Sequence, residues 1–247
     1  MTDYHISEIA RFFGLAPSTL RYWEEQGLLS TGRDAESSYR EYQDKDLMTI
    51  SDIIFYKNLG LPLKQIKQME EKQCRDHLAL LKDKECDLDR QMQALQLQKQ
   101  RVKKRIAALE ELERLRQEPF QEAEIDTECI VSFDLKEQNK LAAYIADPYL
   151  YSRVQRADDL HTEARGLTIP KQLAADFSGQ VLWEKKAGKY LAFLLKEEVA
   201  PGFPNNLQAE LQQLPCQPSG WIISRFLDCG EEDGRVYDYY KTFVEIS

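Results

Sequence analysis

The sequence predicts an α+β fold in three parts, because the character of its 247 residues changes twice. Up to residue 72, short apolar runs with helical spacing alternate with turn residues. Residues 75–117 contain neither Gly nor Pro, and the remainder is rich in β-branched and aromatic runs. We therefore predict domains at 1–72, 73–118 and 119–247, of which the first and last each have enough residues to bury a core.

The first part is predicted to begin with two short helices. Ile6, Ile9 and Phe13 share one helical face, Gly14 offers the left-handed residue that a tight exit needs, and Pro17 suits the first turn of the next helix. Two short helices joined by a Gly-containing turn form a helix-turn-helix, whose second helix enters the DNA major groove. The pattern therefore predicts a DNA-binding domain.

A β-hairpin and two more helices complete this domain. Tyr39 and Arg40 follow a polar turn and begin an alternating segment, which is typical of a strand in a wing that touches phosphate. Asp44 is predicted to cap a helix that ends near Gly60, and Pro62 to begin another. This order of elements predicts a winged helix-turn-helix.

Local placement of side chains, rather than a broad positive field, has to bring this domain to DNA. Residues 1–72 hold 9 Lys+Arg against 12 Asp+Glu, so the general attraction that drives nonspecific DNA binding is missing. We predict base and phosphate contacts from the second helix, the wing and the two later helices. The predicted DNA-binding residues are Ser18, Thr19, Arg21, Tyr22, Arg33, Tyr39, Arg40, Tyr42, Lys57 and Lys64.

The middle part is predicted to be one long helix with a narrow apolar stripe at 3,4 spacing. A stripe of this kind needs a partner helix, so we predict a coiled coil between two copies of the chain. The alternative is that the stripe packs on the chain's own C-terminal domain, and Pro119 marks where the helix has to end. The stripe comprises Leu78, Leu81, Glu85, Leu88, Met92, Leu95, Lys99, Val102, Ile106 and Leu109.

The first 72 residues contain three runs that resemble the DNA-binding domain of the MerR family of transcription regulators. Ala16 stands where that family often has a Ser cap, and Ser38 where its wing usually has Gly, but neither change removes a DNA-contacting residue type. The runs are ISEIARFFGLAPSTLRYWEEQGLL, SYREY and LMTISDIIFYKNLGLPLKQIKQM.

This resemblance implies a cytoplasmic homodimer on palindromic double-stranded promoter DNA, joined by an antiparallel coiled coil. It also implies an activator that acts on RNA polymerase indirectly, by distorting a promoter whose elements are spaced too far apart. No apolar run of 18 or more residues is present, so no membrane partner is expected.

The last part is predicted to be a separate α+β domain. The runs YLAFLLKE, NNLQAELQQL, GWIISRFL and VYDYYKTFVEI predict a strand, a helix and two strands. That unit, used twice, resembles the gyrase-inhibitor-like effector domain of multidrug-sensing MerR relatives. The resemblance implies an earlier unit of the same kind, which we expect to start between Tyr149 and Arg156.

The resemblance further implies that a small amphipathic, often cationic effector binds between the two halves. Aromatic faces attract cations and a buried carboxylate balances their charge; this part also carries 13 Lys+Arg against 21 Asp+Glu, which favours a cation. In the last strand, alternation puts Glu245 on the face of Tyr239 and Phe243, with Asp238 as a further acid. The predicted ligand-binding residues are Tyr149, Tyr151, Trp183, Glu184, Tyr190, Trp221, Tyr239, Phe243 and Glu245.

Two other functions compete with this interpretation. Some MerR relatives sense metals or thiols with Cys near the start of the long helix, where Cys74 stands, but the five Cys residues form no CxxC pair. A small-ligand hydrolase carried on a DNA-binding module would need a base such as Glu184 or Glu245, yet no GxSxG or HExxH motif is present. We therefore predict a regulator with no catalytic residues, metal site or cofactor.

Overall fold

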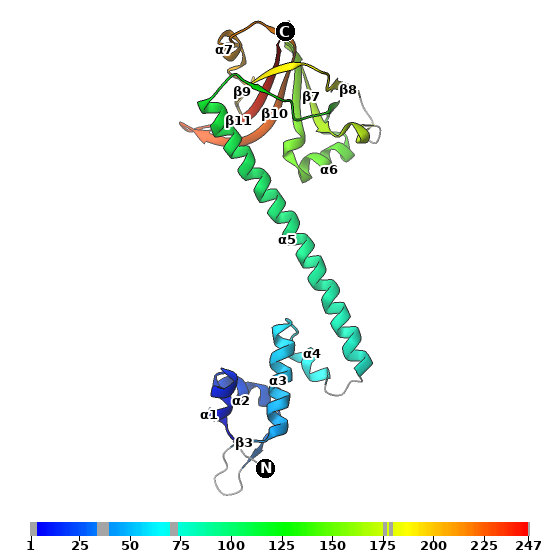
Figure 1. Ribbon diagram of the computed structural model, residues 1–247, viewed down its shortest axis with the longest axis vertical. Helices are drawn as coiled ribbons and strands as arrows, with labels where there is room; N and C mark the ends of the chain where they lie inside the picture. Colours follow the sequence, from blue (N-terminus) through cyan, green and yellow to red (C-terminus); the bar gives the residue numbers. More distant parts are fainter. Residues whose placement is uncertain (1–3, 34–39, 70–73, 175–176, 178–179, 247) are drawn as a thin grey trace. The chain divides into compact units, whose positions relative to one another are not determined.

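The computed structural model describes residues 4–33, 40–69, 74–174, 177 and 180–246. The chain divides into two units, Met1–Gln96 and Leu97–Ser247, each of which is described by itself (Figure 1). The helix α5 (Cys74–Gln117) supplies residues to both. Within the described ranges, no helix combines the length and apolar character that crossing a bilayer requires.

The first unit is a winged helix-turn-helix, and this part of the predicted α+β fold is confirmed. Gly14 ends the first helix at φ 66° and Gly60 follows the third at φ 77°, both in the left-handed region where a side chain would be strained. The antiparallel sheet has the order β1-β3-β2. The elements are β1 (Tyr4–His5), α1 (Ile6–Phe13), α2 (Pro17–Glu25), β2 (Gly32–Arg33), β3 (Arg40–Tyr42), α3 (Asp44–Asn58) and α4 (Leu63–Met69).

The cap of α3 differs from the prediction by one residue. Gln43, not Asp44, is the N-cap, and its backbone N–H donates to the Asp46 carboxylate at 2.8 Å. Asp44 and Asp46 both lie in the first turn, where a negative charge interacts favourably with the helix dipole. The prediction was wrong about the cap because the side chain that satisfies the free N–H comes from inside the helix.

The predicted stripe of α5 is exposed, and a different face of the helix packs on the second unit. Val102, Ile106 and Leu109 are 43–58% exposed, whereas Ala108, Leu112 and Leu115 are buried in the second unit's core. At 3.6 residues per turn the two sets lie about a third of a turn apart. The alternative that this part of the stripe packs on the chain's own C-terminal domain is therefore wrong.

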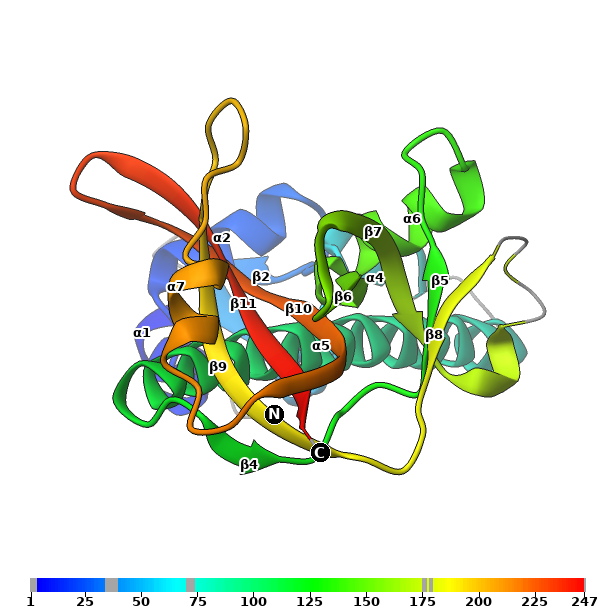
Figure 2. The same cartoon turned by 90° about the horizontal axis from the view of Figure 1, so that it is seen from above.

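The second unit is built on one eight-stranded antiparallel sheet of order β4-β9-β11-β10-β6-β7-β5-β8. Helices α6 and α7 lie towards opposite ends of the sheet, with β11, β10 and β6 between them (Figure 2). Its elements are β4 (Gln121–Ala123), β5 (Cys129–Ser132), α6 (Gln138–Ala146), η1 (Pro148–Leu150), β6 (Tyr151–Arg156), β7 (Asp159–Ile169), η2 (Lys171–Leu173), β8 (Val181–Glu184), β9 (Lys189–Glu198), α7 (Leu207–Gln212), β10 (Pro218–Glu232) and β11 (Arg235–Ile246).

Two strand-helix-strand-strand halves make up most of this sheet, as predicted. They are β5-α6-β6-β7 and β9-α7-β10-β11, and their middle strands β6 and β10 pair from Ser152↔Arg225 to Arg156↔Trp221. The predicted start of the first half between Tyr149 and Arg156 is wrong, because the half begins with β5 at Cys129. That strand is only 4 residues long and buried for most of its length, so it lacks the alternation that identifies longer strands.

Alternation along β11 assigns its side chains to two different cores. Tyr239 and Phe243 join the cluster that contains Leu112 and Leu115 of α5. Tyr240 and Val244 join a second cluster that contains Leu207 of α7. One face of the sheet is therefore covered by α5, and the other is covered near its ends by α6 and α7.

An ion pair between α5 and β11 generates a pH prediction. Arg114, together with Lys241, holds the pKa of Glu111 at about 2. A lowered pKa stabilises the fold above the unfolded value of about 4.3, and this contribution is lost as the pH falls towards 2. We expect Glu111→Gln to lower the free energy of unfolding at pH 7, and the difference from wild type to shrink between about pH 4.5 and 2.

Urea unfolding of the full chain at a series of pH values measures this difference. Glu113→Gln is the matched control, since Glu113 forms a more exposed pair with Arg116 on the same helix and exposed pairs contribute about 0–1 kcal/mol. A Glu111→Gln effect that stayed constant from pH 7 to 2.5 would contradict the assignment.

Candidate functional site

Helix α2 presents part of its predicted DNA-binding surface to solvent. Ser18 and Arg21 are exposed and Tyr22 is 49% exposed, while Thr19 is half-buried. The opposite face, which includes Trp23, is buried in the core of the first unit. Because the apolar residues of α2 lie on its other face, Ser18, Arg21 and Tyr22 remain exposed to solvent. Side chains of these types can bind bases and phosphates.

Glu24 of α2 fixes the wing against this helix. Its carboxylate accepts hydrogen bonds from the Thr31 hydroxyl at 2.9 Å, from Arg40 Nε at 2.5 Å and from the Tyr42 hydroxyl at 3.0 Å. The hydrogen bond with Glu24 raises the pKa of Arg40, and burial raises the pKa of Tyr42. Glu24 is not among the residues predicted from the sequence, because DNA-contacting residues are expected to be cations and hydroxyl donors and Glu24 is an acid.

The predicted DNA contact from Tyr42 has to be corrected. Tyr42 is fully buried and its hydroxyl donates to Glu24, so it positions strand β3 instead of reaching DNA. Arg40 is half-exposed, and Lys57 and Lys64 are exposed. Tyr39 and the Arg33 side chain lie outside the described residues.

Most of the predicted effector residues lie in or against the core under α5. Of the two acids, Glu184 pairs with Lys171 at 3.3 Å and Glu245 accepts a hydrogen bond from the Trp221 backbone N–H at 2.9 Å. The predicted residues of β11 lie on the face that α5 covers, and six predicted aromatic side chains from this and other elements are engaged in packing in or against that core. They are Tyr149, Trp183, Tyr190, Trp221, Tyr239 and Phe243.

A cavity of about 490 Å³ adjoins the uncovered part of the sheet. Both halves of the second unit contribute to its wall, and α5 adds one side chain. Of the nine predicted ligand-binding residues Tyr151 alone lines it, and Asp238, the further acid that the sequence offered, lines it too. The lining residues are Arg105, Phe133, Leu135, Tyr144, Pro148, Tyr151, Arg165, Glu197, Phe203, Phe226, Cys229, Asp238 and Tyr240.

Five aromatic rings of this cavity form a continuous chain of contacts. The ring centroids of Phe133 and Tyr144 are 5.6 Å apart, those of Tyr144 and Tyr151 are 6.0 Å apart, and those of Tyr151 and Tyr240 are 6.4 Å apart. Phe226 continues the chain at 5.8 Å from Tyr240. Tilted and edge-on rings at these separations expose both faces and edges to a guest, which suits a flat aromatic molecule.

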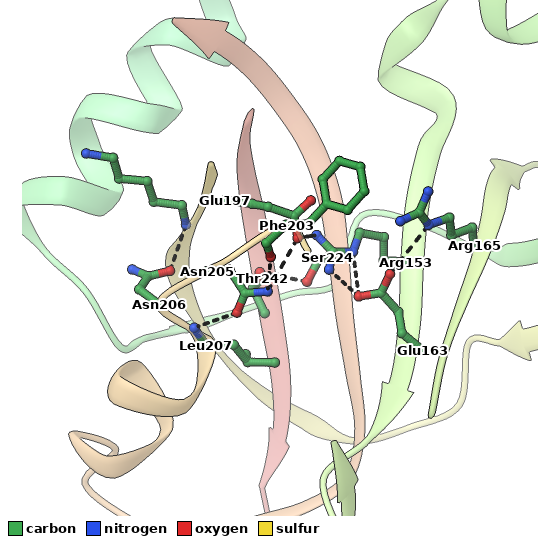
Figure 3. A network of polar contacts seen from close by, with 11 residues as sticks. Arg153, Glu163, Arg165, Glu197, Phe203, Asn205, Asn206, Leu207, Ser224 and Thr242 are labelled. Atoms are coloured by element: carbon green, nitrogen blue, oxygen red, sulfur yellow. Dashed lines mark hydrogen bonds and ion pairs between the residues drawn. The ribbon is translucent and has the colours of Figure 1, made fainter. Parts of the chain in front are cut away.

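A buried arginine neutralises one of the cavity's carboxylates. Arg153 is 7% exposed and donates to Glu163 and, at 2.6 Å, to Glu197 (Figure 3). Its guanidinium lies 5.0 Å from the ring centroid of Tyr240. Its two carboxylate partners raise the pKa of Arg153 against the opposing effect of burial. Arg165 pairs with Glu163 at 3.7 Å. The positive charges of the two arginines therefore balance the negative charges of Glu163 and Glu197.

Asp238 remains as the cavity's unbalanced charge. Arg105 pairs with Asp228, so three arginines and four carboxylates meet at the cavity and beneath it. Among the described residues, Asp238 is the one of these carboxylates without a salt bridge, and burial raises its pKa. The site therefore combines stacked aromatic rings with one net negative charge, the chemistry that binds aromatic monocations.

A second cavity of about 720 Å³ is lined by two acids, Glu210 and Glu232, and by two cations, Arg116 and Lys196, so its formal charges balance. Its acid Glu232 accepts from Arg116, from Lys196 and, at 2.6 Å, from the Tyr239 hydroxyl, and the contact with Lys196 is the main reason that the pKa of Glu232 falls to about 2. Glu210 accepts a hydrogen bond from Asn206, and Tyr239 is the one aromatic residue of this lining. The aromatic cavity, with its linked rings, is therefore the stronger candidate for a site that binds an aromatic cation.

Comparison with known proteins agrees with the geometry of the first unit. The family described as MerR HTH family regulatory protein matches residues 4–73. A probable heavy metal-dependent transcriptional regulator of Haemophilus influenzae is 30% identical over 104 residues, which are 40% of this chain and 81% of that protein. The chain belongs to the MerR family.

This MerR-family protein is also similar to two named activators. The HTH-type transcriptional activator TipA of Streptomyces coelicolor is 28% identical over 44% of this chain, and mta of Bacillus subtilis is 29% identical over 43%. The chain spans about two fifths of the length of both. The crystal structure of MtaN, the N-terminus of the Bacillus subtilis multidrug transporter activator, covers 40% of this chain at 27% identity with a TM-score of 0.38.

Among the described residues, no group of three or more His, Cys, Asp or Glu side chains is arranged to hold a metal ion. The Cys74 side chain, on which the metal-sensor alternative depends, lies outside them.

The role of Glu24 generates a stability prediction. Glu24→Ala removes the acceptor of three hydrogen bonds and leaves the buried Tyr42 hydroxyl unsatisfied, which should cost about 1–3 kcal/mol. Glu25→Ala, at the exposed neighbouring position, should change stability by no more than about 0.5 kcal/mol. Thermal unfolding of both variants tests this prediction. Equal shifts in Tm would contradict the assignment that Glu24 holds the wing.

Proposed function

We propose that the protein is a ligand-responsive transcription regulator that binds promoter DNA through α2 and the wing. The observation that carries this proposal is the exposed row Ser18, Arg21 and Tyr22 on a helix-turn-helix whose wing is fixed by Glu24. TipA and mta, similar over this region, are named as transcriptional activators. A protein acting on promoter DNA and, through it, on RNA polymerase works in the cytoplasm, and we propose no enzymatic activity for it.

Arg21→Ala should weaken binding to double-stranded DNA by about 1–3 kcal/mol, because arginine at a groove-facing position donates to base edges or phosphates. The probe is a duplex selected by the wild-type protein from a random pool, and gel shift measures affinity. Arg11→Ala on α1, another exposed arginine, is the control and should bind as wild type does. Equal affinity of both variants, with normal circular dichroism, would exclude α2 as the recognition helix.

We further propose a homodimer joined by the α5 stripe as an antiparallel coiled coil. Seven apolar stripe residues are 42–63% exposed, which is unfavourable for a single chain in water. The 3,4 spacing is symmetric, so an antiparallel partner brings Met92 against Leu95 and Leu88 against Lys99. Residues 76–89 carry 5 Asp+Glu and 2 Lys while residues 90–109 carry 6 Lys+Arg and no acid, so antiparallel pairing sets opposite charges together.

Cysteine cross-linking tests the direction of the pairing. In an antiparallel dimer the double variant Met92→Cys/Leu95→Cys should form a covalent dimer under mild oxidation. Leu88→Cys should not, because Leu88 lies opposite Lys99 and the two thiols are about 16 Å apart along the helix axis. Wild type controls for the native cysteines. Cross-linking of Leu88→Cys alone would indicate a parallel pair instead.

The aromatic cavity is proposed as the effector site, with Asp238 as the counter-charge of an aromatic monocation. In a partly buried site, a carboxylate that lacks a cationic partner attracts a bound cation strongly. Tyr151, Phe226 and Tyr240 supply the surface on which the aromatic part of the effector stacks. Effector binding would then change how the dimer distorts promoter DNA, an energy of about 1–6 kcal/mol for a smooth bend.

Asp238→Asn should separate charge recognition from stacking. We expect the variant to lose about tenfold or more in affinity for N-methyl-4-phenylpyridinium, and to bind the neutral isostere 4-methylbiphenyl as wild type does. Glu245→Gln is the control, since Glu245 is engaged with the Trp221 backbone. Isothermal titration calorimetry measures both ligands, and equal losses for cation and isostere would contradict a charge role for Asp238.

A further inference from the structure

The wall of the aromatic cavity includes one side chain from α5. Arg105 lines the cavity and pairs with Asp228 of β10, whose side chain is only 4% exposed. Arg105 precedes Ala108 and Leu112 by three and seven residues, so it lies on the helix face that packs under the sheet. The helix proposed to join the two subunits therefore takes part directly in the effector site.

A β-bulge connects the cavity to this ion pair. Phe226 opposes Tyr240 and Asp228 opposes Tyr239, so Leu227 is an extra residue in β10. Bulges change the direction in which successive side chains point. Here Phe226 lines the cavity, Leu227 joins the core that contains Leu112, and Asp228 pairs with Arg105. Residues 226–228 of β10 therefore link the cavity wall to the buried face of α5 and to Arg105.

We propose that an aromatic cation held by Asp238 in this cavity repels Arg105, which lines the same cavity, and that the resulting weakening of the Arg105–Asp228 pair is how α5 senses the effector. The inference rests on the proposed function of the cavity. The buried carboxylate of Asp228 is paired with Arg105, and Arg105 in turn lines the cavity that would hold the charge of the ligand. The two cations repel each other across the shared cavity, so binding of the ligand weakens the bond that holds Arg105 to the sheet.

Thermodynamic reciprocity fixes the sign of the effect. If the cation weakens the Arg105–Asp228 pair, loss of Arg105 must strengthen binding of the cation. Arg105→Gln should therefore bind N-methyl-4-phenylpyridinium roughly five- to tenfold more tightly than wild type, with the neutral 4-methylbiphenyl unchanged. The sign is opposite to that expected for Asp238→Asn, so the two proposals succeed or fail separately.

Calorimetry on the full-length protein with both ligands tests the inference, and Lys104→Gln is the matched control. Lys104 is the next residue of α5 and pairs with Asp147, but it does not line the aromatic cavity. Its substitution should leave affinity for both ligands unchanged. If wild type prefers the cation and Arg105→Gln binds it equally or more weakly, this inference is overturned while the effector site stands. If wild type shows no preference for the cation, the proposed effector class itself is wrong.

Hydrogen exchange supplies an independent measurement. In wild type the cation should speed amide exchange within residues 105–117 of α5, and in Arg105→Gln it should not. Asp228→Asn keeps a side chain of the same size but removes the charge that holds Arg105, so it should speed the same amides without any ligand. Exchange in Asp228→Asn that matches unliganded wild type would overturn the proposal even if Arg105→Gln does not fold.

Discussion

The burial of one face of α5 under the eight-stranded sheet is the constraint on which the second unit depends. Ala108, Leu112 and Leu115 remove that face from water, and they do so by occupying the aromatic side of β11 that carries Tyr239 and Phe243. The aromatic cavity lies against the opposite side of the strand, around Tyr240. The same packing leaves the stripe of α5 exposed, because a helix that gives one face to the sheet has the others free for a second chain.

Charge balance decides which cavity is suited to a guest. In the larger cavity Glu232 is fully engaged by Arg116, Lys196 and Tyr239, and a ligand would have to break those contacts. In the aromatic cavity Arg153 compensates Glu197 and leaves Asp238 with no cation of its own among the described residues. By pairing with Glu197, the buried Arg153 neutralises one of the cavity's carboxylates. The remaining negative charge of the cavity then lies on Asp238.

Local signals in the sequence were sufficient for the helices of the first unit, but they did not identify α6 of the second unit and were insufficient for the site. Gly14, Pro17 and Gly60 mark helix ends through backbone conformations that are intrinsic to these residues, so the first unit could be predicted element by element. Alternation along β11 correctly separated Tyr239 from Tyr240. Which of those two faces is covered depends on where α5 packs, and that is a long-range choice that no local pattern contains. The short strand β5 and the role of Glu24 escaped for related reasons, since the first lacks periodicity and the second acts through partners distant in sequence.

The two halves of the second unit meet along the single strand pair β6–β10, and each half supplies part of the aromatic wall: Tyr144 and Tyr151 come from the first, Phe226 and Tyr240 from the second. An architecture of this kind allows evolution to alter the two sides of the cavity independently. A substitution in one half reshapes one side of the bound molecule's surroundings and leaves the other side intact. A family of regulators can in this way drift from one effector to another through intermediates that retain part of their recognition surface.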